Sequence, residues 1–377
     1  MAERPSERNV AVLVGLDFSA GGYGESIEEL GQLAASAGIQ ARALVRGRRE
    51  RPDPAYFAGS GKVEEIRRTL QEQGASLAIF NHDLSPAQER NLEKALGCPV
   101  VDRTRLILNI FGQRARSHEG KLQVELAQLE HAATRLVRGW THLERQRGGR
   151  GFMGGMGETQ LEVDRRLIAN RVKLLKDKLG KLGRRREVQR RARERGRAFS
   201  VSLVGYTNAG KSTLFNTLTR AGALAEDRLF ATLDTTTRKL YLPEAGNVAI
   251  SDTVGFIRDL PHTLVAAFRA TLEEAVHADL LLHVVDASSD ARDVQIEEVN
   301  KVLAEIGAER IPQALVWNKI DRTGAAPGVD RDAYARIVRV RLSAKTGEGV
   351  DFLRQTLSEA AASRTSKAIP HERAVQA

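Results

Sequence analysis

The feature that most constrains this chain is a glycine-rich octapeptide, residues 205–212, with the spacing G-x-x-x-x-G-K-S. A strand-like apolar run (199–204) precedes it and a helix-like run (213–219) follows it. In such a unit, glycines allow backbone N–H groups to surround a phosphate chain, and the helix N-terminus adds positive potential. The motif predicts a nucleoside triphosphate site, with Lys211 at the β- and γ-phosphates and the Ser212 hydroxyl on Mg²⁺. The residues expected to bind the phosphates are Gly205, Asn208, Ala209, Gly210, Lys211, Ser212 and Thr213.

A second motif, Asn318-Lys319-Ile320-Asp321, follows the apolar run 314–317 and predicts the base. The Asp321 carboxylate can accept hydrogen bonds from guanine N1–H and the N2 amino group, whereas adenine offers neither in that arrangement. A buried Asp321 without these partners would cost roughly 1–3 kcal/mol or more, which favours guanine. Asn318 is expected to tie this loop to the phosphate loop, and the Lys319 stem to lie against the base. After the run 337–342, a backbone N–H for guanine O6 is expected from Ser343, Ala344 and Lys345.

The segment Asp252-Thr253-Val254-Gly255 ends a strand-like run, 248–251, and has the composition of a switch loop. Asp252 is expected to hold Mg²⁺ through a water. Gly255 has no side chain, so its backbone N–H can approach the γ-phosphate.

Upstream, the segment Phe230-Ala231-Thr232-Leu233-Asp234 is expected to carry the switch threonine. Thr232 is the favoured second protein ligand of Mg²⁺ beside Ser212. The neighbouring residues Thr235, Thr236 and Thr237 are the alternatives. Together with Lys211 and Gly255, Thr232 is expected to act directly on the reacting phosphate.

The position after Gly255 holds Phe256, where many GTPases carry a glutamine that orients the attacking water. Phenylalanine cannot do this, so hydrolysis by the free protein should be slow and should need help from a partner or a cation. Asn208, at the fourth position of the phosphate loop, has two interpretations. Its carbonyl could hold K⁺ beside the β- and γ-phosphates, or its side chain could brace its own loop.

The composition limits the remaining possibilities. A chain of 377 residues, 42% of them hydrophobic, should form two or three domains with hydrophobic cores. The net charge of +10 favours a polyanionic partner such as RNA. The single cysteine, Cys98, excludes a disulfide within the chain and a multi-cysteine metal site. No apolar run reaches the ~18 residues that a membrane span needs, and no signal peptide is evident, so we expect a cytoplasmic protein. We also expect it to be monomeric.

The first part of the chain, residues 1–112, alternates strand-like and helix-like runs and predicts a small open α/β sheet. The expected strands are 10–14, 41–45, 77–80 and 100–101, and the expected helices are 26–36, 62–73 and 86–96. A run at 59–62, G-S-G-K, weakly resembles a second phosphate loop. Val63 stands where a Mg²⁺-binding hydroxyl would be needed, so a helix-opening turn is favoured over a second nucleotide site.

Residues 113–197 predict a helical hairpin. Apolar residues repeat at steps of four and three in both halves, which is typical of an antiparallel coiled coil. From Arg165 to Arg197 there are 15 Lys or Arg residues against three acids, which favours contact with nucleic-acid phosphates over a merely solvated face. Between the helices, the glycine-rich loop 139–157 carries arginines and aromatic residues that could stack on unpaired RNA bases. The alternative for this loop is a disordered linker. A doubly wound GTPase domain (198–362) and a polar C-terminal tail (363–377) are expected to follow.

The run Gly157-Glu158-Thr159-Gln160-Leu161-Glu162 strongly resembles the signature of the HflX family of ribosome-associated GTPases. The segments 59–66 and 230–234 also resemble that family, and the resemblance covers about residues 10 to 362. It implies GTP hydrolysis and binding of the N-terminal parts to the large ribosomal subunit and its rRNA. It also implies ribosome splitting, rescue or recycling under stress. The alternatives are an RNA-binding assembly or scaffold factor whose nucleotide state only sets occupancy, and an ATP-dependent RNA remodeller that uses the 59–62 run.

Overall fold

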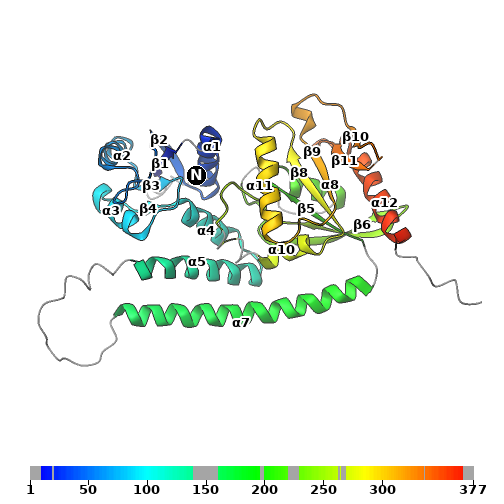
Figure 1. Cartoon of the computed structure of the whole chain (residues 1–377), viewed down its shortest axis with the longest axis horizontal. Helices are drawn as coiled ribbons and strands as arrows, with labels where there is room; N and C mark the ends of the chain where they lie inside the picture. The colour runs from blue at the N-terminus through cyan, green and yellow to red at the C-terminus, as the bar shows by residue number, and fades with distance from the viewer. Residues whose placement is uncertain are drawn as a thin grey trace, which may run out of the picture. The chain divides into compact units, whose positions relative to one another are not determined.

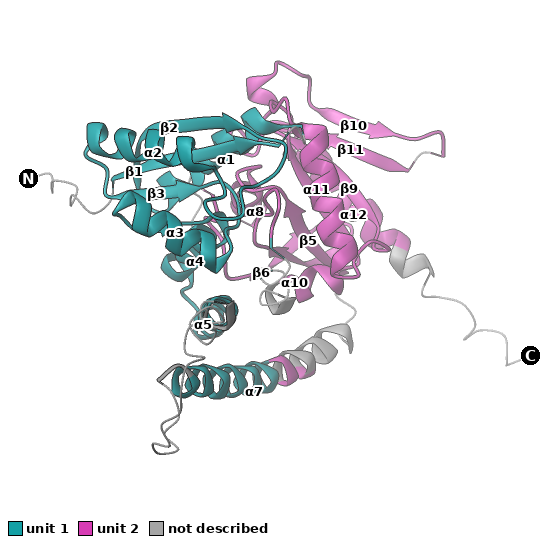
Figure 2. Cartoon of the chain, turned by 60° about the vertical axis from the view of Figure 1, so that its left-hand side comes forward, with its two compact units in different colours: residues 1–182, 261–267 teal, residues 183–260, 268–377 magenta. Residues whose placement is uncertain are grey.

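The computed structural model describes residues 10–18, 21–138, 160–195, 199–219, 229–261, 264, 269–334 and 336–367. The glycine-rich loop predicted at 139–157 lies outside these residues, as does the end of the chain from 368. The chain forms two compact units, Met1–Leu182 with Pro261–Ala267 and Gly183–Leu260 with Phe268–Ala377 (Figure 2). No described helix is both long and apolar enough to cross a membrane.

The first unit begins with a four-stranded sheet in the order β2-β1-β3-β4. All three strand pairings are parallel, which confirms the predicted small open α/β sheet. Helix α1 packs against α4, and α2 packs against α3. The core is apolar, with fully buried Phe80 and Leu92 among its members. The elements are β1 (Val10–Asp17), α1 (Tyr23–Ser36), β2 (Gln40–Arg48), α2 (Ser60–Gln73), β3 (Leu77–Phe80), α3 (Pro86–Leu96), β4 (Val100–Val101) and α4 (Arg103–Arg114).

Local sequence explains where these helices begin and end. Helix α3 starts with a capping box, in which the Ser85 hydroxyl accepts from the Gln88 N–H and the Gln88 side chain accepts from the Ser85 N–H. Gly97 ends that helix in the left-handed conformation that glycine tolerates best. Helix α2 begins at Ser60, inside the run that resembles a second phosphate loop. The Lys62 ammonium donates to Arg46 O and to Glu65 Oε2 at 2.8 and 2.7 Å, which supports the helix-opening turn.

The hairpin consists of α5 (His118–Arg138) and α7 (Gln160–Arg195), which run antiparallel (Figure 1). The predicted seam is present, because Leu122 and Leu126 of α5 form a buried cluster with Leu175 of α7. Val172, Leu179 and Leu182 pack against this cluster. Two ion pairs also join the helices, Arg171–Glu125 at 2.6 Å and Lys176–Glu130 at 2.8 Å.

The second unit is built on a seven-stranded sheet in the order β10-β11-β9-β8-β5-β7-β6. Its five inner strands are parallel to one another, and both edge strands, β6 and β10, are antiparallel to their neighbours. Helices α8 and α12 contribute Phe215 and Leu357 to the main core. Strand β5 lies between β7 and β8, where the strand order reverses. In open α/β sheets, ligands bind at this switch point, beyond the carboxyl ends of the strands.

The elements of this unit are β5 (Phe199–Gly205), α8 (Lys211–Thr219), β6 (Thr236–Leu242), β7 (Gly246–Asp252), α10 (Arg269–Val276), β8 (Leu280–Asp286), α11 (Arg292–Glu305), β9 (Gln313–Asn318), η2 (Ile320–Arg322), β10 (Gly328–Arg331), β11 (Ile337–Arg341) and α12 (Val350–Lys367). The polar tail predicted from residue 363 therefore begins inside α12, because that helix continues to Lys367.

Candidate functional site

The phosphate loop follows β5, and two of its glycines are required by close approach to neighbouring strands. Gly205 has φ 146°, and a Cβ there would lie 2.2 Å from Val284 O. Gly210 has φ 93°, and a Cβ there would lie 2.2 Å from Asn318 Nδ2. No other residue type fits either position without displacing its neighbour. The loop is therefore held at a fixed curvature between β8 and the segment Asn318–Asp321, which we call the base-recognition loop.

Lys211, the first residue of α8, is 6% exposed. Its ammonium donates to Gly205 O at 3.0 Å and to Tyr206 O at 2.8 Å. Burial lowers the pKa of Lys211 to about 8, and the nearby Asp252 carboxylate opposes that shift. The negative charge of a phosphate chain would act in the same direction as Asp252 and hold the ammonium protonated.

Three oxygen ligands suited to Mg²⁺ lie together at the carboxyl end of β7. The Ser212 hydroxyl is 2.6 Å from Asp252 Oδ2 and 2.7 Å from the Thr232 hydroxyl, and Thr232 also reaches Asp252 Oδ2 at 3.0 Å. Two of the three alternatives lie elsewhere, because Thr236 and Thr237 are in β6 and the Thr237 hydroxyl pairs with that of Ser251. The geometry thus favours Thr232 over those neighbours.

The chemistry of these oxygens fits a hard cation. Burial raises the pKa of Asp252, and hydrogen bonds from Ser212 and Thr232 together with the Lys211 charge oppose that rise. Asp252 Oδ1 is buried and has no hydrogen-bond partner. Mg²⁺ prefers hydroxyl, carboxylate and water oxygens to His or Cys ligands. Among the described residues there is no cluster of three or more His, Cys, Asp and Glu side chains that could hold a metal.

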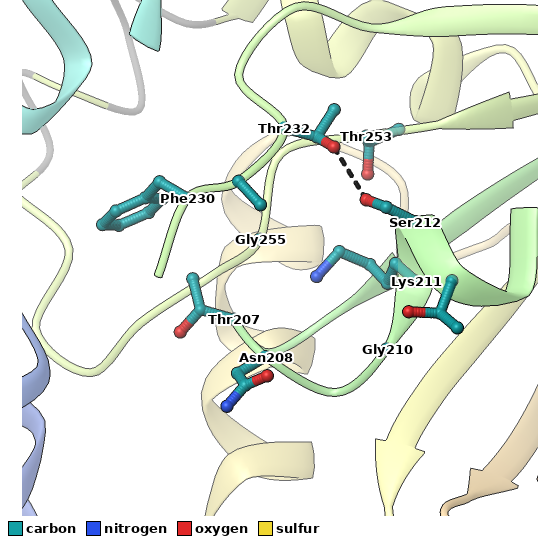
Figure 3. A pocket seen from close by; sticks show the side chains of 11 residues that line it. Thr207, Asn208, Gly210, Lys211, Ser212, Phe230, Thr232, Thr253 and Gly255 are labelled. Atoms are coloured by element: carbon teal, nitrogen blue, oxygen red, sulfur yellow. Dashed lines mark hydrogen bonds between the residues drawn. The ribbon is translucent and has the colours of Figure 1, made fainter. Parts of the chain in front are cut away.

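A pocket opens above the phosphate loop (Figure 3). Most of the predicted phosphate-binding and switch residues line it. Those that do not are half-buried Asp234 and the buried residues Gly205, Ala209, Leu233, Asp252 and Val254. Thr207 also lines the pocket although its residue type gave no signal in the sequence. The lining residues are Thr207, Asn208, Gly210, Lys211, Ser212, Thr213, Phe230, Ala231, Thr232, Thr253 and Gly255.

The base-recognition loop is joined to the phosphate loop as predicted. Asn318 Nδ2 donates to Ala209 O at 2.9 Å, and Asn318 Oδ1 accepts from the Ala344 N–H at 2.8 Å. The second bond engages the Ala344 N–H, one of the backbone groups predicted to serve guanine O6. Lys345, which follows it, is exposed.

Asp321 lies in the short helical turn η2 and is exposed, whereas the sequence predicted a buried carboxylate. The Ser343 hydroxyl donates to Asp321 Oδ1 at 2.6 Å, which fixes the orientation of the carboxylate and leaves Oδ2 for another donor. A surface position keeps the Asp321 charge hydrated, which a buried charge without a partner would not be.

Lys319 has a partner that sequence reasoning missed. Its ammonium donates to Asp286 Oδ2 at 2.6 Å, and its backbone is left-handed, with φ 65°. Burial alone would raise the pKa of Asp286, but hydrogen bonds from Lys319 and Ser288 outweigh it and hold the pKa below its ordinary value. Asp286 is the last residue of β8 and pairs with Asn318, the last residue of β9. Lys319 follows Asn318 directly, so its ammonium can reach the Asp286 carboxylate.

Phe256 is 1% exposed and does not line the pocket. Its backbone pairs with the phosphate loop, since the Phe256 N–H donates to Gly205 O and the Thr207 N–H donates to Phe256 O. The Arg258 N–H also donates to the Tyr206 hydroxyl at 2.7 Å. The Phe256 side chain therefore lies away from the pocket, and its backbone joins this segment to the phosphate loop.

Family models match three stretches of the chain. They are described as "GTP-binding GTPase N-terminal" for residues 24–112, "GTP-binding GTPase Middle Region" for residues 114–193 and "50S ribosome-binding GTPase" for residues 200–319. The GTPase HflX of Escherichia coli K12 is 53% identical over 360 residues, which cover 95% of this chain and 84% of that protein. The chain belongs to the HflX family of GTPases.

A second HflX relative, from Magnetococcus marinus, is 53% identical over 334 residues, 89% of this chain and 77% of that protein. Among solved structures, SsGBP in complex with GDP is 24% identical and has a TM-score of 0.50 over 95% of this chain and 99% of that one. This likeness supports the fold. As a member of this family, the chain is a GTPase that binds GTP and GDP and hydrolyses GTP.

Proposed function

We propose that this HflX GTPase binds the large ribosomal subunit through its N-terminal unit and basic hairpin, and splits or rescues ribosomes in a GTP-dependent cycle. It would act in the cytoplasm as a monomer. The observation that carries the proposal is the charge on α7. Among the described residues, Lys173, Lys178, Lys181 and Arg184 are exposed and make no ion pair. Unpaired cations along one helix suit the phosphates of rRNA.

The hydrolytic step is attack of water on the γ-phosphate of GTP. Lys211 would stabilise the charge that develops on the β- and γ-phosphoryl oxygens, and the Gly255 N–H would donate to the γ-phosphate. Ser212 and Thr232 would hold Mg²⁺ directly and Asp252 through a water. The ion would supply positive charge at the β- and γ-oxygens when bound. Loss of the γ-phosphate would then release the segments around Thr232 and Gly255.

Mixing the purified protein with intact ribosomes tests the proposal. With GTP, and more persistently with a non-hydrolysable analogue, the fraction of free subunits in a sucrose gradient should rise. The same experiment with Lys211→Ala is the control for dependence on the nucleotide site. Co-sedimentation without any change in the subunit distribution would instead support the alternative, an RNA-binding assembly or scaffold factor.

Neutralising exposed charges on α7 should weaken ribosome binding. We expect the triple variant Lys173→Gln, Lys178→Gln and Lys181→Gln to bind ribosomes more weakly. Its salt dependence should be flatter by about 0.7–0.9 log units per lost phosphate contact. Intrinsic GTP hydrolysis should not change, because these residues are remote in sequence from every nucleotide loop. Sedimentation over a salt series provides the measurement.

The matched control neutralises three exposed residues of the second unit, Arg238, Lys239 and Arg310, and thus removes the same net charge. Equal losses of affinity in the two triple variants would mean that only total charge matters. Unchanged binding in both would leave the basic face of α7 as a solvated surface.

We further propose that Asn208 binds K⁺ beside the phosphates. Asn208 is exposed at the pocket and has φ 60°. Its side chain makes no hydrogen bond with any described residue, so no described residue is available for it to brace its own loop. Free protein should hydrolyse GTP faster in K⁺ than in Na⁺ at equal ionic strength. Asn208→Ala and Asn208→Gly should both remove that difference while GTP affinity is largely kept.

Glycine is the informative replacement, because it tolerates the positive φ that alanine would resist. A K⁺ preference that survives in Asn208→Gly, or equal wild-type rates in the two salts, would rule out this cation site. The ribosome would then be the source of activation.

A further inference from the structure

The ion pair between Lys319 and Asp286 lies at the edge of the sheet where a bound nucleotide should lie. The base-recognition loop follows β9 and the phosphate loop follows β5, and β8 lies between these two strands in the sheet. Asp286 is the last residue of β8. In open α/β sheets, ligands bind beyond the carboxyl ends of the strands. The pair is therefore positioned between the loop that should hold the base and the loop that should hold the phosphates.

The contacts of Asp286 hold its carboxylate in one orientation. Its Oδ1 accepts hydrogen bonds from the Ser288 N–H at 3.0 Å and from the Ser288 hydroxyl at 2.6 Å. Its Oδ2 accepts from the Lys319 ammonium at 2.6 Å. The Ala287 N–H also donates to Asn318 O at 2.9 Å, so the backbones that follow β8 and β9 are joined as well. Each carboxylate oxygen thus has its own donor, and Oδ2 is committed to Lys319.

The ion pair orders a long side chain before any nucleotide binds. The side chains of Lys319 and Asp286 are 15% and 18% exposed, so water screens their attraction less than at an open surface. The backbone of Lys319 is left-handed, with φ 65°, a conformation that lysine seldom adopts. With its backbone fixed after β9 and its ammonium fixed at the end of β8, the methylene stem of Lys319 is held at both ends.

This order has a consequence for the binding of a flat base. A side chain that must be ordered when a ligand binds costs binding free energy, and a contact that orders it beforehand removes that cost. The Lys319 stem is expected to lie against the face of guanine, where its methylene groups would lose contact with water. Asp286 carries a negative charge, which disfavours direct contact with the phosphates. Its effect on the nucleotide should therefore pass through Lys319.

We propose that Asp286 is a positioning residue for nucleotide binding. It holds Lys319 so that the methylene stem forms one wall of the base site, and it thereby lengthens the residence time of the nucleotide. The stem contacts the flat face of the base and none of its polar edge groups. Asp286 should therefore strengthen guanine and hypoxanthine nucleotides equally, whereas Asp321 should distinguish them. The proposal rests on nucleotide binding by this GTPase and is independent of ribosome binding.

Asp286→Asn is the direct test of this role. The amide must keep its oxygen toward the Ser288 N–H, so its NH2 group turns toward the Lys319 ammonium and breaks the pair. Affinity for GDP should fall about 3- to 10-fold, mostly through faster dissociation, which stopped-flow measurements with a fluorescent GDP would report. Affinity for inosine diphosphate, which lacks the N2 amino group, should fall by the same factor. Single-turnover hydrolysis of fully bound GTP should stay within about twofold of wild type.

A double-mutant cycle shows whether the effect passes through Lys319. Lys319→Met removes the ammonium and keeps an apolar stem, so it should weaken GDP about as much as Asp286→Asn does. Adding Asp286→Asn to Lys319→Met should cause no further loss. Glu359→Gln is the matched control, because it breaks a pair with Arg331 of 2.8 Å in the same unit, away from the nucleotide loops. It should leave the affinity for GDP unchanged.

Three results would overturn the proposal. One is a wild-type affinity for GDP in Asp286→Asn, and another is a second loss of similar size when Asp286→Asn is added to Lys319→Met. The third is a loss for GDP that clearly exceeds the loss for inosine diphosphate. That result would mean that the substitution displaces Asp321 from the N2 amino group, so that Asp286 supports the whole loop and has no specific role through the Lys319 stem.

Discussion

Asp321→Asn should convert this HflX GTPase from a guanine to a xanthine nucleotide binder. The wild-type carboxylate would accept from guanine N1–H and the N2 amino group, and both bonds are charge-assisted. Replacing the charge with an amide should weaken GTP by roughly 10- to 100-fold, in line with about 1.5–3 kcal/mol for hydrogen bonds to charged groups. Xanthosine triphosphate carries an oxygen in place of the N2 amino group, so the new amide can donate to it.

Competition binding with the four natural triphosphates and xanthosine triphosphate gives the measurement. Asp293→Asn removes the same charge in the same unit, and Asp293 is 80% exposed with Arg292 as its ion-pair partner, so it should leave the ranking of nucleotides unchanged. Equal binding of ATP and GTP by the wild type would remove Asp321 from base recognition. In Asp321→Asn the Ser343 hydroxyl can still donate to Oδ1, so the amide should keep the orientation of the carboxylate.

Arg135→Met should lower the free energy of unfolding of the first unit by roughly 3 kcal/mol or more. Arg135 of α5 contacts the carboxylates of Glu89 in α3 and of Asp102, which caps α4. Their side chains are 12% and 1% exposed. Without Arg135 two poorly hydrated charges lose a partner, although Arg105 still reaches Glu89 at 2.9 Å. Urea unfolding, with hydrogen exchange to locate the loss at α4 and α5, would measure it.

The matched control is Arg68→Met. The pair Arg68–Glu72 is 3.8 Å apart with both side chains more than half exposed, so the loss there should be below about 1 kcal/mol. A loss no larger in Arg135→Met than in Arg68→Met would contradict the importance of the buried contacts. Adding Asp102→Asn to Arg135→Met should recover part of the stability, because the unpaired charge disappears.

The Arg135→Met effect should also depend on pH. Burial raises the pKa of Asp102 to about 6 from an ordinary 3.8, with the Arg105 N–H opposing the rise. The folded state therefore binds this proton more tightly than the unfolded chain. Ionised Asp102 costs stability above its folded pKa, and the cost fades as the pH falls toward 3.8. The loss caused by Arg135→Met should be larger at pH 8 than at pH 5.

Much of the architecture could be predicted because it rests on local patterns. The strand at Leu77–Phe80 and the helix at Pro86–Leu96 have the predicted bounds, since a short apolar run and a Ser-Pro cap define them. The seam around Leu175 followed from its heptad spacing. The antiparallel edge strands β6 and β10 were not predicted, because their exposed, mixed-polarity residues carry little of the alternation that marks a buried strand.

The parts of the candidate site that consist of a continuous sequence motif could be predicted. The octapeptide and the Asn318 motif define their own loops, and Asn318 joins them as expected. Contacts between distant segments escaped prediction. The Asp286–Lys319 pair depends on the register of β8 and β9, and the use of the Ala344 N–H depends on where Asn318 points. Nothing in the sequence indicated that the Thr207 hydroxyl is buried without a hydrogen-bond partner or that Thr207 lies against Gly255.

The bridge between Phe256 and the phosphate loop limits how a γ-phosphate can be sensed. At one end of the segment the Thr253 hydroxyl holds Leu203 O at 2.6 Å, and at the other Phe256 is fastened to Gly205 and Thr207. Only Val254 and Gly255 lie between these anchors. The arrival or loss of a γ-phosphate would therefore directly displace only these two residues. Any larger movement of the chain would have to occur after Phe256, in the segment that starts at Arg258.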